Sequence, residues 1–187
     1  MKRIGLIGED PYDKTAIKNL LVRKFDMVHF QPLLRGIRGK GLDSPKTARA
    51  LVQELKGADY NFLIFIRDLD GLPSQVDIQK GLNKWFEALK HKKTDMLLMN
   101  IWELETLIFG DIDVFNKKYG ADVKCKGDPM MISNPKEKLI SATYKTKSQF
   151  HESDCPDLFS LLDIDKVSAK CKYFAEFLSV LQGRLTA

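Results

Sequence analysis

The sequence predicts an α/β fold, a mostly parallel sheet flanked by helices and followed by a helical C-terminal appendage. Short apolar runs alternate with amphipathic segments in the order β-α-β-α-β-α-β, which is typical of parallel strands joined by crossover helices. Residues 62–66 form an unbroken apolar run, as in a strand buried on both faces. Lysine becomes frequent from Lys117 to Lys147. We therefore expect an α/β domain over residues 1–120 and a lysine-rich helical extension packed on it over residues 121–187.

Each element of the first domain is predicted by a local pattern. The strands are short and apolar, and we expect them at residues 3–8, 27–30, 62–68 and 95–99. The segments between them each have one apolar helical face, and we expect helices at about 13–24, 45–56 and 76–89. Asp13 is the expected N-cap of the first helix, and Ser44 followed by Pro45 starts the second, because these residue types favour helix starts.

The remainder of the chain is expected to be helical. Residues 100–111 have the apolar spacing of a helix. Short helices are expected to start at Asn134 and to cover residues 156–162. Asp165 is the expected cap of a long amphipathic helix that continues through Leu181.

The composition is that of an ordinary globular protein. The 187 residues carry a net charge of +5, which is compatible with nucleic acid but does not diagnose it. The three cysteines lack metal-ligand spacing and are expected to be free thiols. No apolar run approaches membrane-spanning length, and the chain starts with a strand rather than a signal peptide. We therefore expect a cytoplasmic protein without a membrane partner.

Acidic residues follow three of the expected strands. Glu9 follows the first, Asp68-x-Asp70 the third, and Glu103 and Glu105 the fourth. The carboxyl ends of parallel strands meet at one edge of a sheet, and alternation places Asp68 and Asp70 on one side. Residues two apart on a helix point about 200° away from each other, so only one of the two glutamates can face this edge. Carboxylate oxygens suit Mg²⁺ or Mn²⁺, whereas an Asp-Gly turn and a favourable helix dipole are the alternatives.

Basic residues could contact phosphate groups in two places. The loop after the second expected strand carries Arg35, Arg38 and Lys40 between glycines, and its cations and backbone N–H groups suit a phosphate. The lysines of the appendage, Lys136 among them, could follow a nucleic-acid backbone without reading its sequence. A flexible surface loop and an ordinary solvated surface are the alternatives.

The acidic residues and the strand order together resemble the Toprim domain, which is shared by topoisomerases, bacterial primases, small RNA-maturation nucleases and the overcoming-lysogenization-defect (OLD) nucleases. Glu9 matches the glutamate of that domain, and Asp68-x-Asp70 matches its Asp-x-Asp. A closer likeness, over nearly the whole chain, is to small Toprim-like proteins related to the OLD nucleases. The segments that carry it are Glu105–Asp111, Pro135-Lys136-Glu137 and Cys171-Lys172-Tyr173-Phe174. Those proteins usually open with Glu-Gly and a second Glu, whereas this chain has Gly8-Glu9-Asp10-Pro11-Tyr12-Asp13.

The resemblance implies a nuclease that hydrolyses DNA or RNA with Mg²⁺ or Mn²⁺, in the setting of bacterial defence against phages or mobile elements. Two such ions could clamp the attacking and leaving oxygens. The implied metal ligands are Asp68, Asp70, Glu9 and Glu105, with Asp13 and Asp111 as outer candidates. The family pattern favours Glu105 over Glu103. Lys14 could neutralise charge in the transition state, and a solvated helix residue is the alternative reading of this lysine.

Two other functions stay open. The chain could be a non-catalytic Toprim-fold partner that binds nucleic acid or nucleotide and acts with a separate ATPase. A phosphotransferase or nucleotide-binding switch is disfavoured, because the sequence has no Walker-type loop.

Overall fold

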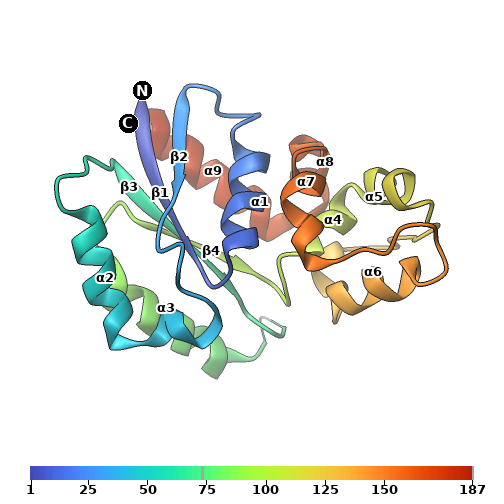
Figure 1. The fold of residues 1–187 in the computed structure, drawn as a ribbon, viewed down its shortest axis with the longest axis horizontal. Helices are drawn as coiled ribbons and strands as arrows, with labels where there is room; N and C mark the ends of the chain where they lie inside the picture. The colour runs from blue at the N-terminus through green and yellow to red at the C-terminus, as the bar shows by residue number, and fades with distance from the viewer. Residues whose placement is uncertain (73, 187) are drawn as a thin grey trace.

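An all-parallel sheet forms the centre of the protein, as expected from the sequence. The structure is a computed structural model that describes residues 1–72 and 74–186, with every side chain in these ranges except that of Lys40. Within them, four strands pair in the order β2-β1-β3-β4. Their bounds are β1 Lys2–Gly8, β2 Val28–Pro32, β3 Phe62–Asp68 and β4 Met96–Asn100. The α/β fold class is therefore confirmed (Figure 1).

Helices cover both faces of the sheet. The crossover helices are α1 Pro11–Leu21, α2 Pro45–Leu55 and α3 Val76–Leu89. On β3, Ile64 and Ile66 belong to a core shared with α1 and the C-terminal helices, whereas Leu63 and Phe65 belong to a core shared with α2 and α3. The expectation that this strand is buried on both faces is confirmed.

The first helix starts earlier than expected. Asp10 is its N-cap, because the Asp10 carboxylate accepts a hydrogen bond from the Tyr12 backbone N–H at 2.6 Å and Pro11 occupies the first helical position. Asp13 is therefore not the cap and lies in the first turn, half-buried. The Ser44 cap of α2 is confirmed, with a 3.3 Å hydrogen bond from the Lys46 backbone N–H.

The C-terminal half contains six further helices among the described residues. They are α4 Thr106–Gly110, α5 Ile112–Tyr119, α6 Pro135–Thr143, α7 Cys155–Phe159, α8 Ile164–Lys170 and α9 Lys172–Thr186. Short 3-10 turns cover Gly39–Asp43, Pro129–Met131 and Glu152–Asp154. The helix expected over residues 100–111 is reduced to α4, because Asn100 still belongs to β4 and Trp102 has left-handed backbone with φ of 62°. The long final helix is capped by Asp163 rather than Asp165 and is interrupted at Cys171, which separates α8 from α9.

The helical extension packs on the sheet domain as expected. One hydrophobic core contains strand residues such as Ile64 together with Phe159 and Phe174 of the extension. Helix α7 lies against α1, and α9 returns along β4 (Figure 1). The boundary near residue 120 stays a prediction. None of the helices in residues 1–72 and 74–186 has both the length and the apolar character that a membrane span needs.

Candidate functional site

Four carboxylates gather at the carboxyl edge of the sheet, and we call Asp13, Asp68, Asp70 and Glu105 the acidic cluster. Asp68 ends β3, and its Oδ1 accepts a 2.9 Å hydrogen bond from the Asn100 amide at the end of β4. Burial raises the pKa of Asp68 well above its usual range, and the charges of the other three carboxylates raise it further. The other three carboxylates are therefore close enough to Asp68 for their charges to act on it.

Asp13 and Glu105 are the members that the fold shelters together with Asp68. Burial is the main cause of the raised pKa of Asp13, and the next largest cause is the charge of Glu105. Glu105 is only 4% exposed, and burial raises its pKa to about 7 despite the opposing effect of its own backbone amide and of Lys136. Cys155 of α7 lies beside it, with Sγ 3.9 Å from Glu105 Oε1. The extension therefore closes one side of the acidic cluster.

Glu9 lies at the same edge but has its own cation. Arg67 Nε is 2.6 Å from Glu9 Oε1, an ion pair without hydrogen-bond geometry, and Arg67 Nη1 is 2.7 Å from Asp43 Oδ1. The guanidinium lies 4.5 Å from the ring centre of Trp85. Burial raises the pKa of Glu9, and Arg67 opposes this shift. Glu9 is therefore paired with a cation that it shares with Asp43.

Lys14 is fully buried, so the alternative of a solvated helix residue is wrong. Its Nζ donates a 3.1 Å hydrogen bond to the Leu34 carbonyl, and the Leu34 N–H donates to Glu54 Oε2 at 2.8 Å. Burial lowers the pKa of Lys14, while Asp10 and nearby acids oppose the shift. With no exposed surface, Lys14 holds the loop after β2 in place rather than contacting a substrate.

Left-handed backbone marks this edge of the sheet. Leu34, Asp70 and Trp102 have φ of 52°, 51° and 62°, and each lies two residues after the end of a strand. The Asp70 N–H donates to the Trp102 carbonyl at 3.0 Å, which joins two of them. Such backbone is unfavourable for residues other than glycine and is concentrated at functional sites. Because β3 ends at Asp68, strand alternation does not extend to Asp70, which is exposed.

Glu103 forms an ion pair with Lys136 of α6. Lys136 Nζ is 3.2 Å from Glu103 Oε1, and the Lys136 N–H donates to Oε2 at 3.3 Å. Burial lowers the pKa of Lys136, but Glu103, Glu105 and Glu152 outweigh it and leave that pKa above its ordinary value. Both glutamates precede α4 rather than lying within it. The expectation that only one of them faces this edge of the sheet stays a prediction. The expected nucleic-acid contact of Lys136 stays a prediction.

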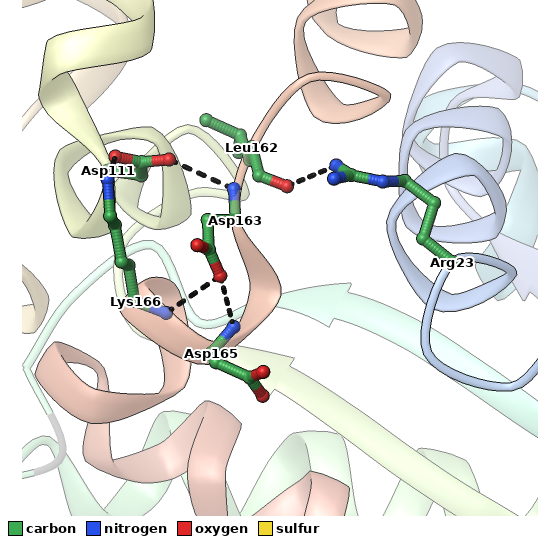
Figure 2. Close-up of polar contacts among 6 residues, drawn as sticks. All are labelled: Arg23, Asp111, Leu162, Asp163, Asp165 and Lys166. Atoms are coloured by element: carbon green, nitrogen blue, oxygen red, sulfur yellow. Dashed lines mark hydrogen bonds and ion pairs between the residues drawn. The ribbon is translucent and has the colours of Figure 1, made fainter.

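Asp111 does not join the acidic cluster, contrary to its expected place as an outer metal ligand. Its Oδ2 accepts a 2.9 Å hydrogen bond from the Asp163 N–H, and Lys166 Nζ is 3.5 Å from Oδ1 (Figure 2). Asp163 in turn caps α8, and Arg23 donates to the Leu162 carbonyl. Helix α4 separates Asp111 from Glu105. Asp111 therefore anchors the start of α8.

The basic loop after β2 reaches the same edge as the acidic cluster. The Gly39 N–H donates to the Glu9 carbonyl at 2.9 Å, which ties the loop to the end of β1. Arg35 and Arg38 are exposed. The side chain of Lys40 lies outside the described part of the structure. A phosphate contact by this loop stays a prediction.

The acidic cluster fits a divalent cation in its chemistry but not in a closed coordination geometry. Among the described residues, no group of three or more His, Cys, Asp or Glu side chains is arranged to hold a metal ion. The donors are hard oxygens, and burial and mutual repulsion raise the pKa of Asp13, Asp68 and Glu105. A bound cation would reverse those shifts.

Fold and site together define an α/β protein with a parallel sheet and an acidic cluster at the carboxyl edge. A protein-family model described as "Domain of unknown function (DUF4276)" matches residues 8–182. The chain therefore belongs to the DUF4276 family. No curated protein and no solved structure was found to match it.

Proposed function

We propose that the protein is a metal-dependent nuclease that hydrolyses phosphodiester bonds at the acidic cluster. One observation carries the proposal: no member of the acidic cluster has an ion-pair partner within 4.0 Å among the described residues. By contrast, Glu9, Glu103 and Asp111 at or near this edge each have one. Sheltered carboxylates without a cation are costly, and Mg²⁺ or Mn²⁺ is the natural counter-charge for them.

The roles of the residues differ from those implied by the Toprim resemblance. Asp68, Asp13 and Glu105 would hold the cation, and exposed Asp70 would complete the set from the solvent side. A cation bound there would supply positive charge for the phosphate and an acidified water. Glu9 needs its carboxylate released from Arg67 before it can contribute. The setting of phage or mobile-element defence belongs to this proposal and is supported by the resemblance alone.

The ion pair between Arg67 and Glu9 also favours a second function. With Glu9 held by Arg67 and no closed metal geometry among the described residues, the chain could be a non-catalytic effector. Such an effector would bind nucleic acid and act with a separate ATPase.

Cleavage assays distinguish the two functions. The protein is incubated with single-stranded DNA, duplex DNA, supercoiled plasmid and RNA, each in Mg²⁺, Mn²⁺ or EDTA. We expect metal-dependent cutting that is lost in Asp68→Asn and Glu105→Gln and retained in Asp77→Asn, a control at an exposed aspartate of α3 that forms no ion pair among the described residues. Cutting that persists in Asp68→Asn would reject the proposed site. If calorimetry shows that the protein binds Mn²⁺ but none of the substrates is cut, the result would favour the non-catalytic effector.

A further inference from the structure

Four exposed lysines from two chain segments lie together at the end of the molecule where α5 stops. Lys117 and Lys118 belong to the last turn of α5, and Lys145 and Lys147 to the loop after α6. Lys118, Lys145 and Lys147 line an open hollow of about 420 Å³. Lys117 and Lys118 line a second hollow of about 450 Å³ with Leu161. We call these four residues the lysine surface.

The lysine surface is not neutralised by the protein. None of its four ammonium groups has an ion-pair partner within 4.0 Å among the described residues. Other lysines of the same half of the chain are paired, Lys124 with Asp122 and Lys136 with Glu103. Clustered cations without counter-ions attract polyanions, and each phosphate contact releases condensed counter-ions.

An exposed aromatic residue adjoins these charges. Tyr144 directly precedes Lys145 and is 71% exposed. Aromatic side chains beside a basic groove are typical of proteins that bind single strands, because unpaired bases stack on the ring. We propose that the lysine surface binds single-stranded nucleic acid, with the lysines on phosphates and Tyr144 on a base.

Helix α6 connects this surface with the acidic cluster. Its second residue, Lys136, pairs with Glu103 and also lies within electrostatic range of Glu105 of the acidic cluster. The helix leads from there to the loop that carries Lys145 (Figure 1). At 1.5 Å per residue, such a short helix spans roughly 13 Å. This step alone rests on the proposed function: a nucleic-acid strand held at the lysine surface is delivered along α6 to the acidic cluster.

Binding is tested without metal, so that it does not depend on cleavage. Fluorescence anisotropy in EDTA compares labelled oligo-dT, labelled oligo-U and a blunt DNA duplex of equal length over a range of salt concentrations. The test variant replaces the lysine surface by Gln at all four positions. The matched control replaces four exposed lysines elsewhere that have no ion-pair partner in the described part of the chain: Lys46, Lys80, Lys84 and Lys93. Circular dichroism verifies that both variants fold.

We expect the test variant to bind oligo-dT at least about tenfold more weakly. The slope of log K for binding against log salt concentration should become less steep by up to about 2.8. The control should bind as the wild type does. Tyr144→Ser should weaken binding of the strands without changing the salt slope, since it removes stacking and no charge.

Three results would overturn the inference. These are an unchanged affinity in the test variant, an equal loss in the control, and tighter binding of the duplex than of the strands. The nuclease proposal can fail separately. If the lysine surface binds strands in EDTA but Mn²⁺ produces no cutting, the binding surface stands and the catalytic assignment falls.

Discussion

The acidic cluster should destabilise the protein at neutral pH, and Glu105→Gln should relieve that cost. Burial raises the pKa of Glu105 from 4.5 to about 7. Between these values the folded state binds more protons than the unfolded state, so the free energy of unfolding falls as the pH rises across that window. At pH 7 the shift corresponds to about 3 kcal/mol.

Glu105→Gln keeps the size of the side chain and removes the charge. In EDTA at pH 7 we expect the variant to be more stable by up to about 3 kcal/mol, or roughly 6–12 °C in Tm for a chain of this size. Part of the pH dependence should persist, because burial also raises the pKa of Asp13 and Asp68. Urea unfolding from pH 4.5 to 8 measures both effects.

Two comparisons make this prediction decisive. Glu137→Gln, at an exposed α6 position that has no ion-pair partner within residues 1–72 and 74–186, should change the stability by less than about 0.5 kcal/mol. Mn²⁺ should raise the Tm of the wild type more than that of Glu105→Gln, because a ligand that binds the folded state stabilises it. A Glu105→Gln protein that is less stable than the wild type at pH 7 would refute the account of an uncompensated buried charge.

Four further variants test the assignments in which structure and sequence differ. Asp10→Ala should cost about 1 kcal/mol through loss of the α1 cap, while Asp13→Asn should not destabilise the protein; equal losses in urea unfolding would contradict the assignment of the cap. Asp111→Ala should cost about 1–3 kcal/mol by leaving the Asp163 N–H without its acceptor, with Mn²⁺ affinity unchanged by calorimetry; a loss of affinity would return Asp111 to the metal site. Lys14→Met should cost at most about 2 kcal/mol, because it leaves the buried Leu34 carbonyl without its donor but also removes a buried cation; a larger loss would indicate that the Leu34 contact is worth more than a single hydrogen bond.

The fold followed from local patterns in the sequence. The unbroken apolar run of β3 predicted burial on both faces, and Ser44-Pro45 predicted the start of α2; the structure confirms both. The shared edge of Asp68 and Glu105 followed from the parallel order of the strands, because successive parallel strands end on the same side of the sheet. These properties depend on spacing over a few residues and on chain topology, so the sequence was sufficient for them.

Only the tertiary structure decided which of the acidic residues are left without a cation. Arg67 neutralises Glu9, Lys136 neutralises Glu103, and the Asp163 amide, 52 residues from Asp111 along the chain, holds that carboxylate. The same is true of the lysine surface, whose two segments become neighbours only where the loop after α6 meets the end of α5. Such pairings depend on which surfaces meet after folding, and neither the type of a residue nor its local spacing encodes the partner that it will meet.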